Sequence, residues 1–200
     1  MSSLFPAEPI SLQLPDADIV YFPSFFSSEV AADLYLDLLR EIPWQQDNIK
    51  VFGKEHAQPR LTALFGNDAK PYSYSNITMQ PKPWNLLLQK IKYHVESVAE
   101  INFTTVLLNY YRDGKDSNGW HSDNEKELGL NPTIASVSLG SERMFQLKHN
   151  TDPSLRQNIL LENGSLLIMK GATQHHWKHQ IPKTSKPIGG RINLTFRVIH

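Results

Sequence analysis

A histidine and an aspartate stand two positions apart in the stretch Trp120-His121-Ser122-Asp123. If this stretch is a β-strand, side chains alternate between its faces, so His121 and Asp123 point the same way. An imidazole and a carboxylate on one face make two thirds of a 2-His-1-carboxylate triad, which leaves coordination positions open and suits non-haem Fe(II) oxygenases. The spacing alone is a weak signal, because the same tripeptide also occurs in surface turns. A third ligand must come from elsewhere in the chain.

The far end of the chain supplies candidates for that ligand. Residues 173–182, T-Q-H-H-W-K-H-Q-I-P, include His175, His176 and His179. Because one more histidine completes a triad, the other two are expected to be structural or solvent-facing. The remaining histidines, from which we expect no chemistry, are His56, His94, His149 and His200.

An alternating strand follows at residues 191–197, R-I-N-L-T-F-R. One face carries Arg191, Asn193, Thr195 and Arg197, and the other carries Ile192, Leu194 and Phe196. Two arginines and an amide are costly to bury without anionic partners, and a small dicarboxylate would supply them. The alternative is a solvent-facing strand of a half-exposed sheet.

The composition is that of a soluble globular protein. The 200 residues suit one domain, with 40% hydrophobic and 20% charged residues. Formal net charge is zero, so any nucleic-acid site must be a local patch that binds in a salt-sensitive way. The absence of cysteine excludes disulfides, zinc–thiolate sites and cysteine nucleophiles. With no apolar run near ~20 residues and no secretory signal pattern, we expect an intracellular protein without membrane attachment.

The first half of the chain is expected to hold two helices. Residues 1–17 contain three prolines and no sustained periodicity, so we predict a loosely attached arm. A short strand at 18–22 precedes a helix from Ser27 or Ser28 to Glu41, and a second helix is predicted at about 84–100, opened by Pro83. Residues 49–52 are expected to be extended, and 58–74 to form irregular strands and loops.

The second half changes to short strands separated by glycines. The predicted strands are 105–112, 119–123, 133–139, 143–148, 157–161, 165–169, 177–181 and 191–199. Their number and spacing favour a double-sheet jelly roll, with the two early helices over one outer face. The fold class is therefore mainly β with flanking helices. We expect one domain at residues 18–200, with its core at about 105–200.

Several blocks in a fixed order resemble the AlkB-like Fe(II)/2-oxoglutarate dioxygenases, which remove alkyl groups from nucleic-acid bases. The resemblance covers about residues 50–198, and the eukaryotic-type DNA- and RNA-repair members are the most similar. Its most specific elements are the R-x-N-x-T-F-R ending and the upstream H-x-D. The other blocks are V-F-G-K, P-R-L-T, Y-S-Y-S, N-Y-Y-R-D-G, A-S-V-S-L-G, L-L-I-M-K-G-A-T and W-K-H-Q-I-P.

The resemblance implies a set of metal and cosubstrate residues. His121, Asp123 and His179 would bind Fe(II), and His179 is chosen because it directly precedes Gln-Ile-Pro. The residues that would bind 2-oxoglutarate are Arg191 at the distal carboxylate, helped by Asn109 and Tyr111, and Asn193 and Arg197 near the carboxylate that chelates iron. Tyr111 also has a simpler interpretation, as a core aromatic residue.

The resemblance also implies a nucleotide-recognition lid at about residues 50–80 and a set of substrate contacts. Tyr72 and Tyr74 match aromatics over the base, Glu125 matches an acidic residue that contacts it, and Phe52 matches a residue that fills the gap left by a flipped base. Arg60 lies with Lys50 and Lys54 in a basic patch beside this loop. The alternatives are an exposed apolar residue at Phe52 and a solvated face for the patch.

The implied reaction is oxidative demethylation of N-alkylated bases of the N1-methyladenine and N3-methylcytosine type, in DNA and also in RNA. It would use Fe(II), 2-oxoglutarate and O2 and release formaldehyde, succinate and CO2, acting on a flipped or single-stranded base. We expect a monomer that repairs alkylation damage, cytoplasmic in a bacterium and nuclear in a eukaryote. The choice between DNA and RNA, and between single and double strands, stays open.

Three other functions fit parts of the pattern. A 2-oxoglutarate oxygenase acting on protein or lipid would share the metal and cosubstrate residues. A catalytically silent nucleic-acid-binding homologue would not need the complete triad. A metal-binding cupin with isomerase-like chemistry would not need the polar face of residues 191–197.

Overall fold

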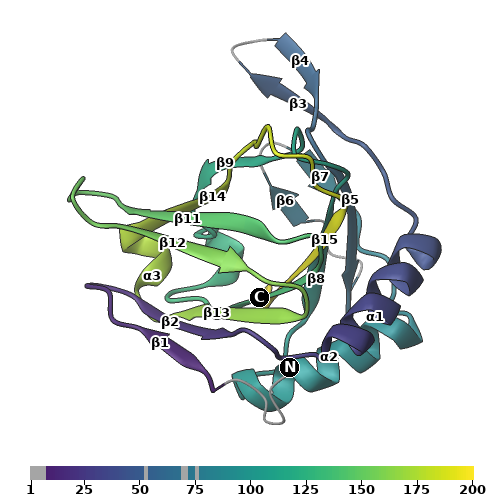
Figure 1. The fold of residues 1–200 in the computed structure, drawn as a ribbon, viewed down its shortest axis with the longest axis horizontal. Coiled ribbons are helices and arrows are strands. Elements are labelled where there is room, and N and C mark those ends of the chain that lie inside the picture. The colour runs from purple at the N-terminus through teal and green to yellow at the C-terminus, as the bar shows by residue number, and fades with distance from the viewer. Residues whose placement is uncertain (1–7, 52–53, 69–71, 75–76) are drawn as a thin grey trace.

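Two antiparallel sheets form the body of the protein in the computed structural model (Figure 1). The structure describes residues 8–51, 54–68, 72–74 and 77–200, and among these it leaves the side chains of 49–51, 54, 72–74 and 77–78 undescribed. The larger sheet has the order β1(Ile10–Leu12), β2(Asp18–Phe22), β13(Ser165–Lys170), β10(Ile134–Gly140), β15(Arg191–Arg197), β8(Thr105–Tyr111) and β5(Leu61–Gly66). The smaller sheet has the order β12(Arg156–Leu161), β11(Arg143–His149), β14(Trp177–Ile181) and β9(Asn118–His121).

Two helices cover the outer face of the larger sheet (Figure 1). Helix α1(Ser28–Glu41) begins where the Ser27 side chain accepts a hydrogen bond from Val30 N, and α2(Leu86–Ala99) begins where Asn85 accepts from Leu88 N. The predicted α2 start at residue 84 was early, because Asn85 provides the cap. The mainly β fold, with antiparallel sheets and two covering helices, confirms the fold class predicted from the sequence.

The two faces of the central strand β15 have different surroundings, because the helices cover one face and the smaller sheet lies over the other. Ile192, Leu194 and Phe196 pack against the helices in one apolar core. The alternate residues point to the space between the sheets, and all of them are buried. A solvent-facing polar face is therefore excluded. This arrangement places charged side chains inside the protein, where they need partners.

Some elements differ from the sequence-based expectation. Residues 10–12, placed in a loose arm, form β1 and pair with β2 at the edge of the larger sheet. Strand β9 ends at His121, so Asp123 follows the strand and does not belong to it. A short helix, α3(Thr173–His176), precedes β14 where no helix was expected. The 3-10 turn η1(Lys126–Leu128) follows Asp123.

The segment predicted to be a lid, about residues 50–80, contains two separate hairpins with β5 between them, and β5 is a buried strand of the larger sheet and not part of a lid. Strands β3(Asn48–Val51) and β4(Lys54–Ala57) pair with each other, as do β6(Tyr72–Tyr74) and β7(Ile77–Met79). In Figure 1 the β3–β4 hairpin projects from the edge of the body. None of the helices that the structure describes is long and apolar enough to cross a membrane.

Candidate active site

The three residues proposed as metal ligands meet between the sheets. His121 ends β9, Asp123 follows two residues later, and His179 lies in the middle of β14 directly across from His121. Their candidate ligand atoms all lie within 4.8 Å of one another, and the two imidazole rings have centroids 4.2 Å apart. The sequence argument from strand alternation was wrong in detail, since Asp123 lies beyond β9. The strand pairing of β9 with β14 brings the histidines together.

The ring of His121 is held in one tautomer. Its Nδ1 lies 2.8 Å from the carbonyl oxygen of Gly119, which can only accept a hydrogen bond, so Nδ1 carries the proton. Nε2 then carries the lone pair; it lies 3.3 Å from Asn118 Nδ2, which can donate a hydrogen bond to it, and 3.8 Å from Oδ1 of Asp123. A backbone carbonyl on the far nitrogen is the usual orienting contact of a metal-bound histidine.

Asp123 is a buried carboxylate with two supports. Its Oδ2 accepts a hydrogen bond of 2.9 Å from Arg197, and its backbone N–H donates to the Gln174 side chain. Burial by itself would raise the pKa of Asp123, but Arg197 and the two histidines outweigh it and lower the pKa to about 2. Within the described part of the chain, Oδ1 has no hydrogen-bond partner. A buried, charged and unsatisfied oxygen fits a cation.

The histidines of the cluster are neutral near pH 7. Burial, followed by the neighbouring His121, lowers the pKa of His179 to about 3, although Asp123 opposes the shift. Burial also lowers the pKa of His121. Neutral imidazoles and an ionised carboxylate are the protonation states that metal ligation requires. The residues therefore fit a divalent iron ion.

The opposite part of the same cavity is built to hold an anion. Arg191 is 1% exposed, and its Nη2 donates a 2.8 Å hydrogen bond to Ser138 Oγ. Among the described residues, its Nε and Nη1 atoms have no hydrogen-bond partner. Burial lowers the pKa of Arg191 to about 10, which leaves it charged at neutral pH. A buried guanidinium with two free donors fits the carboxylate of a small acid.

Strand pairing explains why the residues predicted to bind 2-oxoglutarate are neighbours. Arg191 pairs with Tyr111, and Asn193 pairs with Asn109, on the adjacent strands β15 and β8. The guanidinium carbon of Arg191 lies 5.2 Å from the centre of the Tyr111 ring. One cavity is lined by all eight residues predicted for metal and cosubstrate, which are Asn109, Tyr111, His121, Asp123, His179, Arg191, Asn193 and Arg197.

The structure does not place the residues predicted to contact substrate at the cavity, within the part of the chain that it describes. Phe52 lies outside the described residues, and Tyr72 and Tyr74 lie on β6 with undescribed side chains. Glu125 directly precedes η1 and is not among the described residues that line the cavity. Arg60 is 4% exposed and donates to Asn109 Oδ1 and Ser117 O, so its guanidinium is occupied inside the protein.

Some residues that build the cavity were not singled out from the sequence. Ser136 and Ser138 accept hydrogen bonds from Asn193 and Arg191, and both belong to the quoted block A-S-V-S-L-G. Their alternation on one strand was the available signal. Gln174, which receives the Asp123 N–H, carried no signal, because its partner is 51 residues away.

Comparison with known proteins places the chain in a family. The model of the 2OG-Fe(II) oxygenase superfamily matches residues 18–197. The chain therefore belongs to the 2OG-Fe(II) oxygenase superfamily, whose members use Fe(II), 2-oxoglutarate and O2. Within it the chain is AlkB-like. It is 41% identical over 187 residues to the bovine alpha-ketoglutarate-dependent dioxygenase alkB homolog 3, covering 89% of this chain and 65% of that protein.

Further relatives agree with this assignment. The chain is 38% identical over 184 residues to the human DNA oxidative demethylase ALKBH2, covering 87% of this chain and 70% of that protein. The solved structure of OsALKBH1 matches with a TM-score of 0.67 at 17% identity, over 96% of this chain and 100% of that one. This structural match concerns the fold. The chain spans slightly less than two thirds of the length of the alkB homolog 3 proteins that it matches.

Proposed function

We propose that this protein removes methyl groups oxidatively from N-alkylated nucleic-acid bases and so repairs alkylation damage. The observation that carries the proposal is the single cavity in which Asp123, two neutral histidines and the buried Arg191 meet. This cavity offers a place for a divalent metal and, beside it, a place for a dicarboxylate. The names of the relatives support nucleic acid as the substrate, since one is a DNA oxidative demethylase.

We assign the metal to His121, Asp123 and His179. When bound there, Fe(II) together with 2-oxoglutarate and O2 supplies hydroxylation of an N-methyl group, with formaldehyde, succinate and CO2 as products. The chain keeps the three ligands in the correct protonation states through burial and the Arg197 contact. Arg197 therefore acts as a positioning residue for Asp123, and its positive charge would also favour the second carboxylate of 2-oxoglutarate.

We assign the distal carboxylate of 2-oxoglutarate to Arg191. Ser138 holds one nitrogen of the guanidinium, and the donors on Nε and Nη1 would bind the carboxylate. Tyr111 and Asn109 complete this end of the site from β8. Asn193 is fixed by Ser136 and lies between Arg191 and Arg197 on the same strand face.

Base recognition is assigned to the residues that the resemblance indicates. Tyr72, Tyr74 and Glu125 would contact the damaged base, and Phe52 would fill the stack when a base leaves a duplex. Arg60 would act through Asn109, which it holds by a 2.7 Å hydrogen bond. We propose one domain that comprises β1 together with residues 18–200, and a lid formed by the two hairpins on either side of β5. We also propose a monomer that works in the cytoplasm of a bacterium or the nucleus of a eukaryote.

The test is a panel of methylated single- and double-stranded DNA and RNA, incubated with Fe(II), 2-oxoglutarate and O2. We expect mass spectrometry to show loss of the methyl group from N1-methyladenine or N3-methylcytosine, with one succinate formed for each methyl group removed. Succinate formation without demethylation of any nucleic acid would point to a protein or lipid substrate. Failure to bind Fe(II) or to turn over 2-oxoglutarate would favour the silent nucleic-acid-binding alternative.

A variant at Phe52 tests whether demethylation of duplex DNA needs a residue that demethylation of single strands does not. Single strands need no wedge, whereas leaving a duplex stack costs a few kcal/mol per step. Phe52→Ala should therefore reduce demethylation in a duplex far more than in the matching single strand, with 2-oxoglutarate binding intact. Equal losses on both substrates would make Phe52 a packing residue or a general contact.

A further inference from the structure

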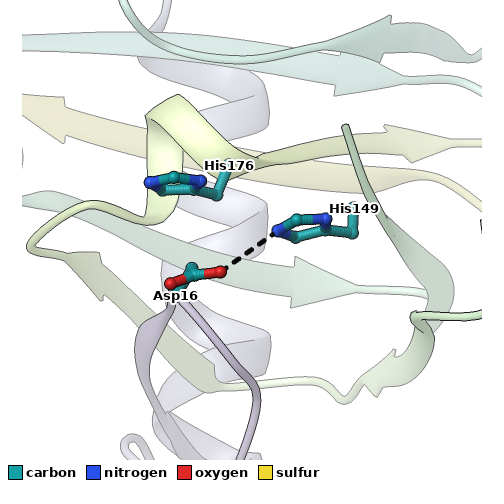
Figure 2. Close-up of side chains that lie close together, drawn as sticks. All are labelled: Asp16, His149 and His176. Carbon is teal, nitrogen blue, oxygen red and sulfur yellow. Dashed lines mark ion pairs between the residues drawn. The ribbon is translucent and has the colours of Figure 1, made fainter. Parts of the chain in front are cut away.

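A second group of two histidines and one aspartate lies outside the cavity. The candidate ligand atoms of Asp16, His149 and His176 lie within 4.8 Å of one another. Asp16 comes from the loop between β1 and β2, His149 ends β11, and His176 ends α3. In Figure 2 the carboxylate of Asp16 lies next to the ring of His149, and the ring of His176 lies beside that ring in a nearly parallel plane, with the two ring centroids 5.9 Å apart. From the sequence, we expected no chemistry from His149, and we expected His176 to be structural or solvent-facing once His179 completed the triad.

Three hydrogen bonds fix the segments that carry this group. The indole N–H of Trp177 donates to the carbonyl oxygen of Pro15, next to Asp16, at 2.9 Å. Asn150 donates from its backbone to His176 O and from its side chain to His175 O, both at 2.7 Å. The backbone segments that carry Asp16, His149 and His176 are therefore held by contacts that do not use these three side chains, as expected of a preorganised site.

His149 is the buried member of the group. It is 9% exposed, its Nε2 has no hydrogen-bond partner among the described residues, and this atom lies 3.5 Å from Oδ2 of Asp16. Ligand atoms around a tetrahedral zinc ion at the usual bond lengths are about 3.3 Å apart. The Asp16–His149 separation therefore needs little change for both atoms to bind one ion.

The tautomer of His149 can adapt to a metal. Its Nδ1 lies 3.2 Å from Asp152 N and 3.4 Å from Thr151 N, both long contacts, and 3.3 Å from Thr151 Oγ1. Without a metal, the two N–H groups make Nδ1 an acceptor, so Nε2 carries the proton and faces Asp16. With a metal on Nε2, the proton is on Nδ1, and the Thr151 hydroxyl oxygen can accept a hydrogen bond from this N–H. Thr151 and Asp152 are exposed, so water can replace the two lost contacts.

We propose that Asp16, His149 and His176 form a second metal site, for a divalent borderline ion such as Zn(II). Two imidazoles and one carboxylate suit zinc and are a poor set for Ca²⁺ or Mg²⁺, which take oxygen ligands. Asp16 has a side chain that is 54% exposed, so water can reach the fourth position. The bound ion joins the β1–β2 loop and α3 to the end of β11, and its role is structural.

The test uses the whole chain, freed of metal with a chelator and dialysed against Zn(II). In the variant His121→Ala/His179→Ala, which removes the first cluster, we expect one equivalent of zinc by elemental analysis. Adding His176→Gln or Asp16→Asn to that background should weaken zinc binding at least about tenfold, as loss of a ligand contact does. Adding His175→Gln, the neighbouring histidine, should leave zinc affinity unchanged.

Two results would overturn the second site. One is a folded background variant that binds no zinc, which would leave Asp16 and His149 as a simple pair closing the loop. The other is an equal loss of affinity from His175→Gln and His176→Gln, which would indicate surface binding. If circular dichroism shows that the background does not fold, the same comparison is made in the otherwise unchanged chain. There His176→Gln should lower bound zinc from two equivalents to one, whereas no change would contradict the proposal.

Discussion

Two clusters in this protein have the same donor types and different surroundings. The cluster of His121, Asp123 and His179 lies between the sheets, where Arg197 pairs with the carboxylate. The cluster of Asp16, His149 and His176 lies where the β1–β2 loop, the end of β11 and the end of α3 meet, and the side chain of Asp16 is 54% exposed. The donor set alone therefore does not decide chemistry. The cavity beside the first cluster is also lined by the buried guanidinium of Arg191, and this difference separates the proposed active site from the proposed structural site.

The largest expected effect separates the two clusters by turnover. His121→Ala, Asp123→Ala or His179→Ala should abolish both demethylation and succinate formation, because each removes one of three protein ligands. His175→Ala and His176→Ala should largely retain both activities. Turnover of the methylated substrate, followed by mass spectrometry, makes the comparison. Loss of activity in the His175 or His176 variant alone would show that the wrong histidine was assigned.

The next largest effect tests the anion pocket around Arg191, which adjoins the first cluster but not the second. Arg191→Ala should raise the concentration of 2-oxoglutarate needed for half-maximal turnover, because breaking a buried charge pair costs ~3–5 kcal/mol. Ser138→Ala removes only one neutral partner of that guanidinium, so its cost is about 1 kcal/mol. A titration of 2-oxoglutarate with each variant measures both. An unchanged requirement in the Arg191 variant would refute this assignment.

Acid should destabilise the metal-free protein through the first cluster. The pKa of His179 falls from 6.5 to about 3 on folding, so the unfolded chain binds the extra proton between these values. The free energy of unfolding should therefore fall, by a few kcal/mol at most, as pH decreases from about 6.5 toward 3. It should fall less in His179→Gln, which lacks the titrating imidazole. Denaturant titrations at several pH values test this, and identical slopes in wild type and His179→Gln would contradict it.

The smallest effect concerns the short helix that contributes to both clusters. Helix α3 carries His176 of the second cluster and Gln174, which accepts the Asp123 N–H of the first. Gln174→Ala leaves that buried N–H without its acceptor, at a cost of about 1–3 kcal/mol. We expect a lower melting temperature and weaker Fe(II) binding, with His175→Ala as the unaffected control. Unchanged iron affinity would show that Gln174 does not position Asp123.

Local sequence determined the parts of the site that depend on the alternation of polar and apolar residues along a strand. The polar face of residues 191–197 was predicted from period two, and in β15 it does face the cavity while the apolar face meets the helices. The helices and most strands were also predictable, because caps, prolines and glycines mark their ends. The specific H-x-D and R-x-N-x-T-F-R spacing identified the family that the comparisons then showed.

Tertiary structure decided what depends on pairing between distant segments. Asp123 lies outside β9, so its position comes from Arg197 and Gln174, which are 74 and 51 residues away. Arg60 turned inward to Asn109, although its sequence position beside a basic patch suggested a surface contact. Asp16 and His149 belong to no motif; they meet because His149 lies opposite Trp177 in the β11–β14 pairing, and the Trp177 indole donates to Pro15, next to Asp16. A sequence records which groups are available, whereas their distances and burial exist only once the sheets have closed.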